Sequence, residues 1–405
     1  MGNVPKLRFK GFEEKWGKAK INEISHINPK VEKLEDKFYY IDLESVKKGS
    51  VNKMTEVERE VAPSRAQRAL SKGDVLYQLV RPYQKNHFYF DMDLKKQVVA
   101  STGFAQIRVR SDVDGQFLTQ LLLTDRINKE VTRRCTGTSY PAINSADFGE
   151  IKVYFPSKKE QLKISRFLFE LEEKLKLQQE KIQLLKEQKK GYMQKLFNRE
   201  LRFKNENGNL FADWKVRSLI ELVTPVKGNN IKNEELKKYP ILTISAKSGF
   251  LNQEDRFSQV IAGSSLKKYT EIHKGDLSYN KGNSKIAKYG CVYQMNSYEK
   301  ALVPNVYKSF RSKDNINPLF LQYYFQSKIP DKELRKIITS TARTDGLLNV
   351  SDNDFYNIPI NIPCIKEQNE IAKFINALDK KIKVETEKYN LFEKKKLGLL
   401  QQMFV

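Results

Sequence analysis

The sequence predicts an α+β fold. We expect two mixed α/β domains joined by two long helices that form an intramolecular antiparallel coiled coil, with a pseudo-twofold internal repeat. The chain repeats itself, each copy ends in a helical heptad pattern, and the segment before each pattern mixes short strand-like and helical runs. Residues 147–197 match residues 354–404 without a gap, at a constant offset of 354 − 147 = 207. Two copies of one unit can place equivalent surfaces around a pseudo-twofold axis.

The repeat divides the chain into domains. With 405 residues the chain is long enough for two domains that each bury a core. β-branched and aromatic runs such as 98–100 and 239–244 predict strands, and 117–128 and 319–327 predict helices. The expected segments are a first variable domain at 1–156, a helix at 157–200, a second variable domain at 201–363 and a C-terminal helix at 364–405.

The two copies also open alike, although the residues between the matching landmarks share little identity. Leu7-Arg8-Phe9-Lys10 with Trp16 recurs as Leu201-Arg202-Phe203-Lys204 with Trp214, and Lys72-Gly73-Asp74 recurs as Lys274-Gly275-Asp276. The helix of the first copy runs directly into the opening of the second copy, and the helix of the second copy ends the chain. The chain would nearly close a ring, so we expect its two ends to lie near each other in space.

Each long helix carries apolar residues at alternating steps of four and three, the heptad seam of a helix that packs lengthwise on another helix. The polar breaks coincide, since Gln178 matches Glu385 and Lys189 matches Lys396, and such breaks often fix register at a cost in stability. From residue 164 to 196, at about 1.5 Å per residue, the rod is about 48 Å long, more than one turn of duplex DNA. The predicted seam residues are Ile164, Leu168, Leu171, Leu175, Ile182 and Leu185 in the first helix and Ile371, Ile375, Leu378, Ile382, Tyr389 and Phe392 in the second.

Heptads alone are equally compatible with a homodimer of such rods. The nearly closed ring and the matched polar breaks favour pairing within one molecule, antiparallel, with a domain at each end.

The charge indicates a polyanionic partner. The formal net charge is +24, from 73 Lys and Arg against 49 Asp and Glu. This excess favours the release of counterions from DNA or RNA, the sequence-independent part of nucleic-acid affinity. A lysine-rich composition that merely reflects an AT-rich genome is the alternative. The hydrophobic content of 40% and aromatic content of 11% exclude a disordered chain.

Several kinds of chemistry are missing from the sequence. No run approaches the roughly 18 apolar residues of a membrane span, and no apolar signal region opens the chain, so we expect a cytoplasmic protein. There is no Asp-Pro-Pro-Tyr-like tetrapeptide for amino methylation and no phosphate loop ending in Gly-Lys-Ser or Gly-Lys-Thr. Pro330-Asp331 lacks the nearby Glu-x-Lys of many nucleases. Neither a metal site nor a structural disulfide is expected, because the cysteines and histidines are isolated: Cys135, Cys291, Cys364, His26, His87 and His273.

Three kinds of loop suit DNA. One follows each Lys-Gly-Asp strand, one precedes each heptad helix, and a third, near residue 65, has no counterpart in the second copy. Arg and Lys bind guanine edges or phosphates, Asn and Gln fit adenine edges, and Ser, Thr and Gly let backbone amides approach phosphate. An ordinary solvated loop is the alternative for any one residue. The candidate DNA-binding residues are Arg65, Gln67, Arg68, Arg81, Tyr83, Gln84, Lys85, Arg133, Arg134, Thr136, Thr138, Ser139, Tyr140, Asn280, Lys281, Asn283, Ser284, Lys285, Ser340, Thr341, Arg343 and Thr344.

With these motifs the chain resembles the specificity subunit of a type I restriction-modification system over essentially all of its residues. The signatures are the opening residues 7–9 with Trp16, the Lys-Gly-Asp strands, and Pro156 through Glu160-Gln161 to Phe167, repeated as Pro363 through Glu367-Gln368 to Phe374. Two copies of this pattern with heptads and variable domains are specific. The loops 140–144 and 345–349 differ in composition, which puts residue-by-residue transfer of DNA contacts in doubt.

The resemblance implies a non-catalytic subunit of a phage-defence complex. Two target recognition domains would each read one part of a split, asymmetric sequence in double-stranded DNA, and the helix pair would fix the gap. It implies two modification subunits, which bind S-adenosylmethionine and methylate adenine, and two ATP-driven restriction subunits. We expect no cofactor in this chain, with S-adenosylmethionine, ATP and Mg on the partners, and no membrane partner.

Two other readings come from different classes. One is an enzyme, a fused nuclease or methyltransferase with unrecognised motifs, which would bind S-adenosylmethionine as the isolated chain. The other is a non-enzymatic coiled-coil adaptor, which would have no salt-dependent affinity for DNA.

Overall fold

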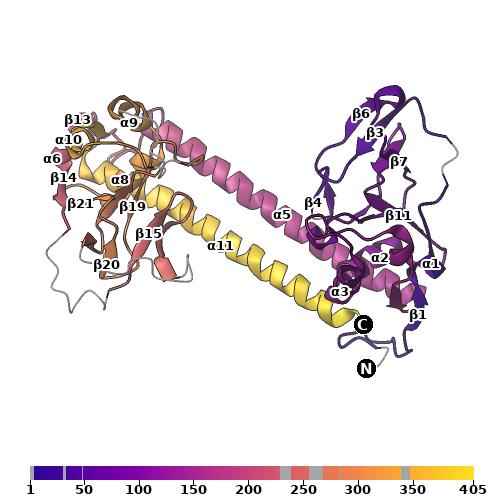
Figure 1. The fold of residues 1–405 in the computed structure, drawn as a ribbon. Helices are drawn as coiled ribbons and strands as arrows, with labels where there is room; N and C mark the ends of the chain where they lie inside the picture. Colours follow the sequence, from indigo (N-terminus) through magenta and orange to yellow (C-terminus); the bar gives the residue numbers. More distant parts are fainter. Residues whose placement is uncertain are drawn as a thin grey trace. The chain divides into compact units, whose positions relative to one another are not determined.

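The computed structural model describes residues 4–30, 33–47, 49–228, 239–254, 268–282, 284–338 and 347–405. The chain divides into two compact units. Unit 1 is Met1–Glu180 with Thr386–Val405, and unit 2 is Lys181–Glu385. Each unit contains one variable domain and a stretch of both long helices, α5 (Lys158–Phe197) and α11 (Ile365–Met403) (Figure 1). The predicted fold class, two repeated mixed domains with two long helices, is confirmed.

Unit 1 contains two four-stranded sheets. In the first, with order β2-β11-β8-β9, all neighbours are antiparallel, and in the second, with order β6-β3-β10-β7, the β3–β10 pair is parallel. The pairs β1–β12 and β4–β5 are separate. The strands are β1 (Gly17–Lys20), β2 (Ser25–Ile27), β3 (Lys37–Ile41), β4 (Val46–Lys47), β5 (Ser50–Val51), β6 (Thr55–Glu58), β7 (Ala66–Ala69), β8 (Val75–Gln78), β9 (Phe88–Tyr89), β10 (Val98–Ser101), β11 (Phe104–Val109) and β12 (Lys152–Phe155). The shorter helices are α1 (Ile21–Ile24), α2 (Gly115–Leu122), α3 (Asp125–Arg134) and α4 (Ser145–Gly149), with 3-10 turns at Arg59–Val61 and Pro82–Gln84.

Unit 2 repeats the first of these sheets with the order β14-β21-β18-β19. Among its described residues the remaining strands form the pairs β13–β22, β15–β16 and β17–β20. The strands are β13 (Lys215–Ser218), β14 (Val223–Val226), β15 (Leu242–Ser245), β16 (Gly249–Asn252), β17 (Thr270–His273), β18 (Leu277–Asn280), β19 (Cys291–Gln294), β20 (Lys300–Val303), β21 (Lys308–Ser312) and β22 (Pro359–Ile362). The shorter helices are α6 (Leu219–Leu222), α8 (Pro318–Gln326), α9 (Asp331–Ile337) and α10 (Asp352–Tyr356). The isolated parallel bridge between Ile241 and Leu302 joins β15 to β20, as β3 pairs in parallel with β10 in unit 1.

Within each unit the two long helices pair antiparallel. In unit 1, Glu172 of α5 forms an ion pair with Lys396, near the end of α11. In unit 2, the equivalent residues Asp379 and Lys189 pair at 2.7 Å. The matched lysines that interrupt the seam therefore form ion pairs with half-buried carboxylates of the facing helix. Pairing within one chain excludes the reading in which the rods serve only to form a homodimer.

The end of each long helix completes the core of a variable domain. In unit 1, Phe404 packs against the rings of Trp16 and Phe117 at centroid distances of 6.2 and 5.2 Å. In unit 2, Phe197 packs against Trp214 and Phe320 at 6.4 and 5.6 Å, with further contact to Tyr324. Burial of an aromatic side chain of this size stabilises a fold by roughly 1.5–3 kcal/mol. Seven seam residues are buried and five are half-buried: Ile164, Leu168, Leu175, Ile182, Leu185, Ile371 and Ile375, then Leu171, Leu378, Ile382, Tyr389 and Phe392.

The repeated Glu-Gln pair holds the variable domain to the start of its long helix. Gln161 accepts a hydrogen bond from the backbone amide of Asp114, the N-cap of α2, and donates to the carbonyls of Asp112 and Pro156. Gln368 makes the same three bonds with Asn317, Asn315 and Pro363. Since both glutamines are buried, these bonds satisfy polar groups that would otherwise lack partners.

The repeated Lys-Gly-Asp sequence is also a structural element. Gly73 and Gly275 have φ angles of 93° and 94°, a conformation that glycine adopts without a Cβ penalty. The turn places Asp74 in the core beneath Arg108, with two bonds of 2.8 Å, and Asp276 beneath Arg311, at 2.7 and 2.9 Å. The hydrogen bonds that each arginine donates to its aspartate raise the pKa of that arginine.

The two ends of the chain lie together, as the near-closed ring predicts. The amide of Leu7 donates to the carbonyl of Gln402 at 2.9 Å. The amide of Leu201 donates to the carbonyl of Lys195 at 3.1 Å, and these residues occupy the matching positions at the covalent junction between the copies. The free ends therefore reproduce the geometry of the continuous junction.

Candidate nucleic-acid interface

Two loops that the sequence analysis selected in the first domain come together in unit 1. Val80 forms an isolated bridge with Ala142, and the amide of Arg81 donates to the carbonyl of Pro141 at 2.7 Å. The amide of Ile143 donates to the carbonyl of Leu79 at 3.1 Å. These bonds join residues 79–85 to residues 136–143 along one edge of the domain. We call these two segments the paired loops.

Residues 81–85 are held firmly in place. Arg81 and Lys85 flank the 3-10 turn with φ angles of 53° each, and Pro82 between them is buried. The ammonium group of Lys85 lies 3.1 Å from both the carbonyl of Leu123 and a carboxylate oxygen of Asp125. Such bonds fix the loop before any ligand arrives, which lowers the entropic cost of binding.

The polar and aromatic side chains of the paired loops differ in their contacts within the protein. The guanidinium of Arg81 lies 4.3 Å from the centre of the Tyr140 ring, and Tyr140 and Tyr83 are largely exposed. Gln84 is exposed and its side-chain carbonyl accepts a bond from the Gln78 amide at 2.8 Å. Thr136, Thr138 and Ser139 are exposed on the second loop, where Thr136 also bridges to Ala142.

Arg133 and Arg134 belong to the last turn of α3 rather than to a loop. Both pair with Glu130, at 3.0 and 2.6 Å, in the i,i+3 and i,i+4 positions of one helix. The hydrogen bond from Arg134 lowers the pKa of Glu130. Their charge is therefore partly neutralised, although Arg133 stays exposed.

The third segment, Arg65 to Arg68, also lies mostly in a strand rather than a loop. β7 forms an edge of its sheet, and the carbonyl of Arg65 accepts from the amide of Thr102 at 2.8 Å. Gln67 is exposed and donates to the carbonyl of Ser64. Arg68 is half-buried, and burial lowers its pKa.

The turn between β10 and β11 connects this edge strand to the paired loops. Next to Thr102, the carbonyl of Gly103 accepts from the amide of Leu79 at 2.9 Å. Backbone hydrogen bonds therefore link the segment near residue 65 to the turn at 102–103, and this turn to residue 79. Our sequence analysis missed this turn, although Thr102-Gly103 between two apolar runs is a recognisable turn signal.

In unit 2 the equivalent loop is built differently. Asn280 donates to the carbonyl of Ile244 at 3.0 Å and accepts from the amide of Gly282 at 2.9 Å. The carbonyl of Lys281 accepts from the amide of Leu348 at 2.9 Å, which joins the two loops as in unit 1. Ser284 and Lys285 are exposed. Five candidates lie outside the described residues: Asn283, Ser340, Thr341, Arg343 and Thr344.

His87 is a structural residue near the paired loops. It is fully buried, stacks on Tyr77 at 4.0 Å, and its Nδ1 accepts from the amide of Gln78. Burial, and to a smaller extent the charge of Lys85, lowers the pKa of His87 to about 3. The ring is therefore neutral at pH 7. In the described part of the chain no group of three His, Cys, Asp or Glu side chains could hold a metal ion.

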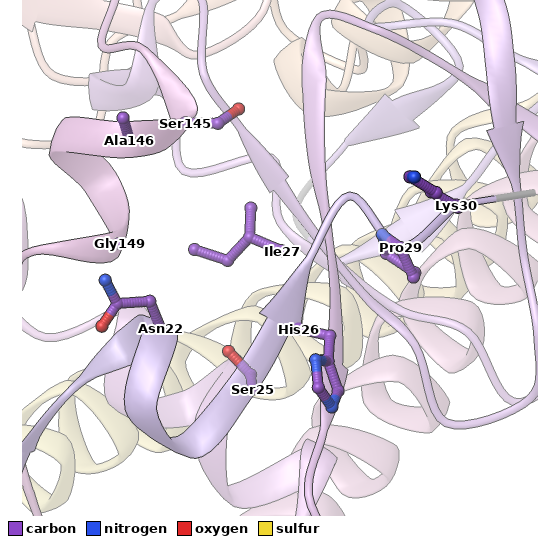
Figure 2. A pocket seen from close by; sticks show the side chains of 9 residues that line it. All are labelled: Asn22, Ser25, His26, Ile27, Pro29, Lys30, Ser145, Ala146 and Gly149. Atoms are coloured by element: carbon purple, nitrogen blue, oxygen red, sulfur yellow. The ribbon is translucent and has the colours of Figure 1, made fainter.

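An open concavity of about 570 Å³ lies between α1, β2 and α4 (Figure 2). Ile27 points from β2 toward the backbone of Gly149, where a Cβ would come within 3.0 Å of the Ile27 side chain. Polar groups of the lining bond within the protein, since Asn22 donates to Glu150 and Ser145 bonds to Asn28. We assign this concavity to the packing of α4 and not to DNA binding. Among the described residues, no helix has the length and apolar character that a membrane span requires.

Comparisons with known proteins agree on one family. The family model for the type I restriction modification DNA specificity domain matches residues 13–187 and again residues 212–394. A stretch of 325 residues is 26% identical to the Type I restriction enzyme MjaVIII specificity subunit of Methanocaldococcus jannaschii, covering 76% of this chain and 73% of that protein.

Two solved structures share the fold. The S subunit of a type-I restriction-modification system from M. genitalium is 15% identical, covers 99% of both chains and gives a TM-score of 0.57. A chain from work on complex assembly and conformational transition of the type I R-M system is 19% identical, covers 98% of this chain and 99% of its own, and gives a TM-score of 0.56.

Proposed function

Because the chain belongs to the type I restriction-modification DNA specificity family, we propose that it reads a split, asymmetric sequence in double-stranded DNA, with one part read by each variable domain. It is a specificity subunit, the non-catalytic part of its complex, like the curated relative that it matches along most of its length.

One observation supports the proposal of a two-part target. The frame of the two variable domains is the same to the level of single hydrogen bonds, as the Gln161 and Gln368 contacts show, while the loops that face outward differ. The paired loops carry Arg81 and Tyr140, and the matching loop of unit 2 carries Asn280 and Lys281. Base edges are distinguished by the donors and acceptors that reach them, so different loops fit different sequences. We infer two different half-sites rather than a palindrome.

The charge supports duplex DNA as the ligand. With a net charge of +24, the chain should release counterions from the DNA backbone when it binds. The logarithm of its affinity should therefore fall linearly with the logarithm of the salt concentration. A coiled-coil adaptor without a DNA role would show no such slope.

The partners and cofactors follow from the same proposal. Two copies of one helical frame suit two copies of a modification subunit, which would bind S-adenosylmethionine and methylate adenine. Restriction subunits that use ATP and Mg would join through them. The long helices would both dock these partners and set the gap between the half-sites.

The test is to purify the chain with its modification subunit and map methylated adenines across a genome. We expect a single motif made of two unlike parts separated by a fixed gap. A contiguous target would contradict the split reading, and S-adenosylmethionine binding by the isolated chain would favour an enzyme instead.

A further inference from the structure

The Arg81–Tyr140 pair combines a half-buried arginine with an exposed ring. The guanidinium carbon of Arg81 lies 4.3 Å from the centre of the Tyr140 ring, and 64% of the surface of Tyr140 is exposed. A guanidinium that stacks on an aromatic face has its plane set by the ring, while its N–H groups still point outward along that plane. The pair therefore places a guanidinium, which carries a planar set of donors, beside an exposed ring.

The backbone beneath this pair is constrained. Arg81 has a φ of 53° and a ψ of 53°, a left-handed conformation that non-glycine residues seldom adopt. Its amide is bonded to the carbonyl of Pro141, one residue after Tyr140, so the bond that joins the paired loops also places the two side chains together. Strained backbone that its surroundings hold in place is concentrated at functional sites.

Three other basic candidates of the first domain are already engaged in ion pairs. Arg133 and Arg134 pair with Glu130, and Lys85 pairs with Asp125. Among the described residues, no carboxylate forms an ion pair with Arg81, which is bound by a ring rather than by an opposite charge. An arginine in this state keeps its full charge and its hydrogen-bonding edge for a ligand.

Two kinds of DNA contact could use that edge. A phosphate contact needs positive charge and tolerates a mobile side chain, and lysine serves as well as arginine. A guanine contact needs two parallel donors in the base plane, directed at O6 and N7, and depends on the orientation of the fork. Contact with the Tyr140 ring restricts the orientations that this fork can adopt.

We propose, on the basis of the function proposed above, that Arg81 held by Tyr140 reads a guanine in the major groove of the half-site bound by the first variable domain. Tyr140 is the positioning residue. The second copy has Asn283 at the offset of 202 residues that relates the two Lys-Gly-Asp motifs, so a guanine contact by arginine is specific to the first half-site.

The experiment uses the full-length chain in complex with its modification subunit. Duplexes carry the mapped target with each base pair of both half-sites changed in turn, and their affinities are measured by competition. For the wild type we expect one G·C pair in one half-site whose replacement weakens binding about tenfold to hundredfold. Both Arg81→Ala and Arg81→Lys should abolish that preference and leave the preferences of the other half-site unchanged.

The variants of Tyr140 and of Arg133 complete the design. Tyr140→Phe keeps the ring face and should keep the preference, whereas Tyr140→Ala should reduce it severalfold. Arg133→Ala removes a more exposed charge that is already paired and should change no base preference. The intact second half-site shows in every case that the complex is folded.

The outcomes separate the two proposals. Equal weakening of all duplexes by Arg81→Ala, with recovery in Arg81→Lys, would identify a phosphate contact and overturn the guanine assignment. Unchanged base preferences in Arg81→Ala would also overturn it. If the wild-type complex shows no split target at all, the proposed function fails first, and the assignment of Arg81 fails with it.

Discussion

Arg8 donates two parallel hydrogen bonds to Glu160, from Nε to Oε1 and from Nη2 to Oε2, each 2.7 Å long. Arg202 donates to Glu367 in the same way, at 3.1 and 3.0 Å, and the indole of Trp214 donates a third hydrogen bond to Glu367. Both carboxylates are fully buried in the first turn of a long helix. Each pair therefore fastens the opening segment of one copy to the start of its own helix.

Removal of the charge from Glu160 should destabilise unit 1 markedly. In Glu160→Gln the nearly buried Arg8 loses its carboxylate, and breaking a buried ion pair from one side costs about 3 kcal/mol. The chain has two tryptophans, Trp16 in unit 1 and Trp214 in unit 2, so a Trp214→Phe background reports the unfolding of unit 1 alone by fluorescence in urea.

The matched control is Glu170→Gln, which breaks the exposed Arg166–Glu170 pair of the same helix. Exposed i,i+4 pairs contribute about 0.3–0.5 kcal/mol. An equal loss in both variants would refute the role of the buried pair.

The sequence was a good guide to the frame for a physical reason. Heptad periodicity is a local pattern, so both helices could be predicted from apolar spacing. Their antiparallel pairing was predicted from the nearly closed ring and the matched polar breaks. The roles of Glu160 and Gln161 could not, because their partners, Arg8 and Asp114, lie far away along the chain. The repeat singled out these residues, and only the structure shows that they form bonds within the variable domain.

Acid should weaken unit 1 through His87. In the unfolded chain its pKa is about 6.5. In the folded chain burial lowers it to about 3. Between these values the unfolded state holds a proton that the folded state does not. The free energy of unfolding is therefore not reduced by His87 above about pH 6.5. It falls as the pH drops toward 3, by up to about 1.4 kcal/mol per pH unit.

His87→Phe should remove this part of the pH dependence. The phenyl ring can still stack on Tyr77, but the amide of Gln78 loses its acceptor, so the variant starts about 1–3 kcal/mol less stable at neutral pH. Urea unfolding in the Trp214→Phe background at pH 7.5, 6.0 and 5.0 measures both effects. Parallel losses with pH in the variant and its parent would show that His87 does not titrate on unfolding.

The ion pair between Lys189 and Asp379 should couple the two helices in unit 2. Lys189→Glu places two carboxylates together, and the double variant Lys189→Glu, Asp379→Lys should recover part of the loss, with a coupling energy of about 0.5–3 kcal/mol. Recovery should be incomplete because the hydroxyl of Tyr323 now donates to Asp379 at 2.9 Å. Fluorescence of Trp214 in a Trp16→Phe background reports this unit.

Lys383→Glu is the control for this charge reversal. It makes the same change at an exposed position of α11 and should alter stability by less than about 0.5 kcal/mol. A double variant no more stable than the sum of its two single changes would show that the pair does not hold the helices in register.

The candidate interface was predictable only in part. Residues 81–85 and 136–140 were selected by composition, and the structure brings them together through backbone bonds between segments about sixty residues apart. Arg133 and Arg134 were placed in a loop because the helix was expected to end near residue 128. Their partner Glu130 lies one turn away on the same helix, a spacing that would have indicated ion pairs had the helix been extended.

Longer helices should lengthen the gap in the DNA target. Seven residues inserted into α5 after Glu180 and seven into α11 after Glu385 keep the heptad seam in phase and add about 10 Å to the pair. If the helices set the spacing, the mapped gap should grow by up to about three base pairs, at 3.4 Å each, while both half-sites keep their sequences. Methylated-adenine mapping of the variant complex measures the gap directly.

A seven-residue insertion in α5 alone shifts the seam by a full heptad against α11, so it should impair folding rather than redefine the target. An unchanged gap in a folded double-insertion complex would refute the spacing role and leave the helices with partner docking alone.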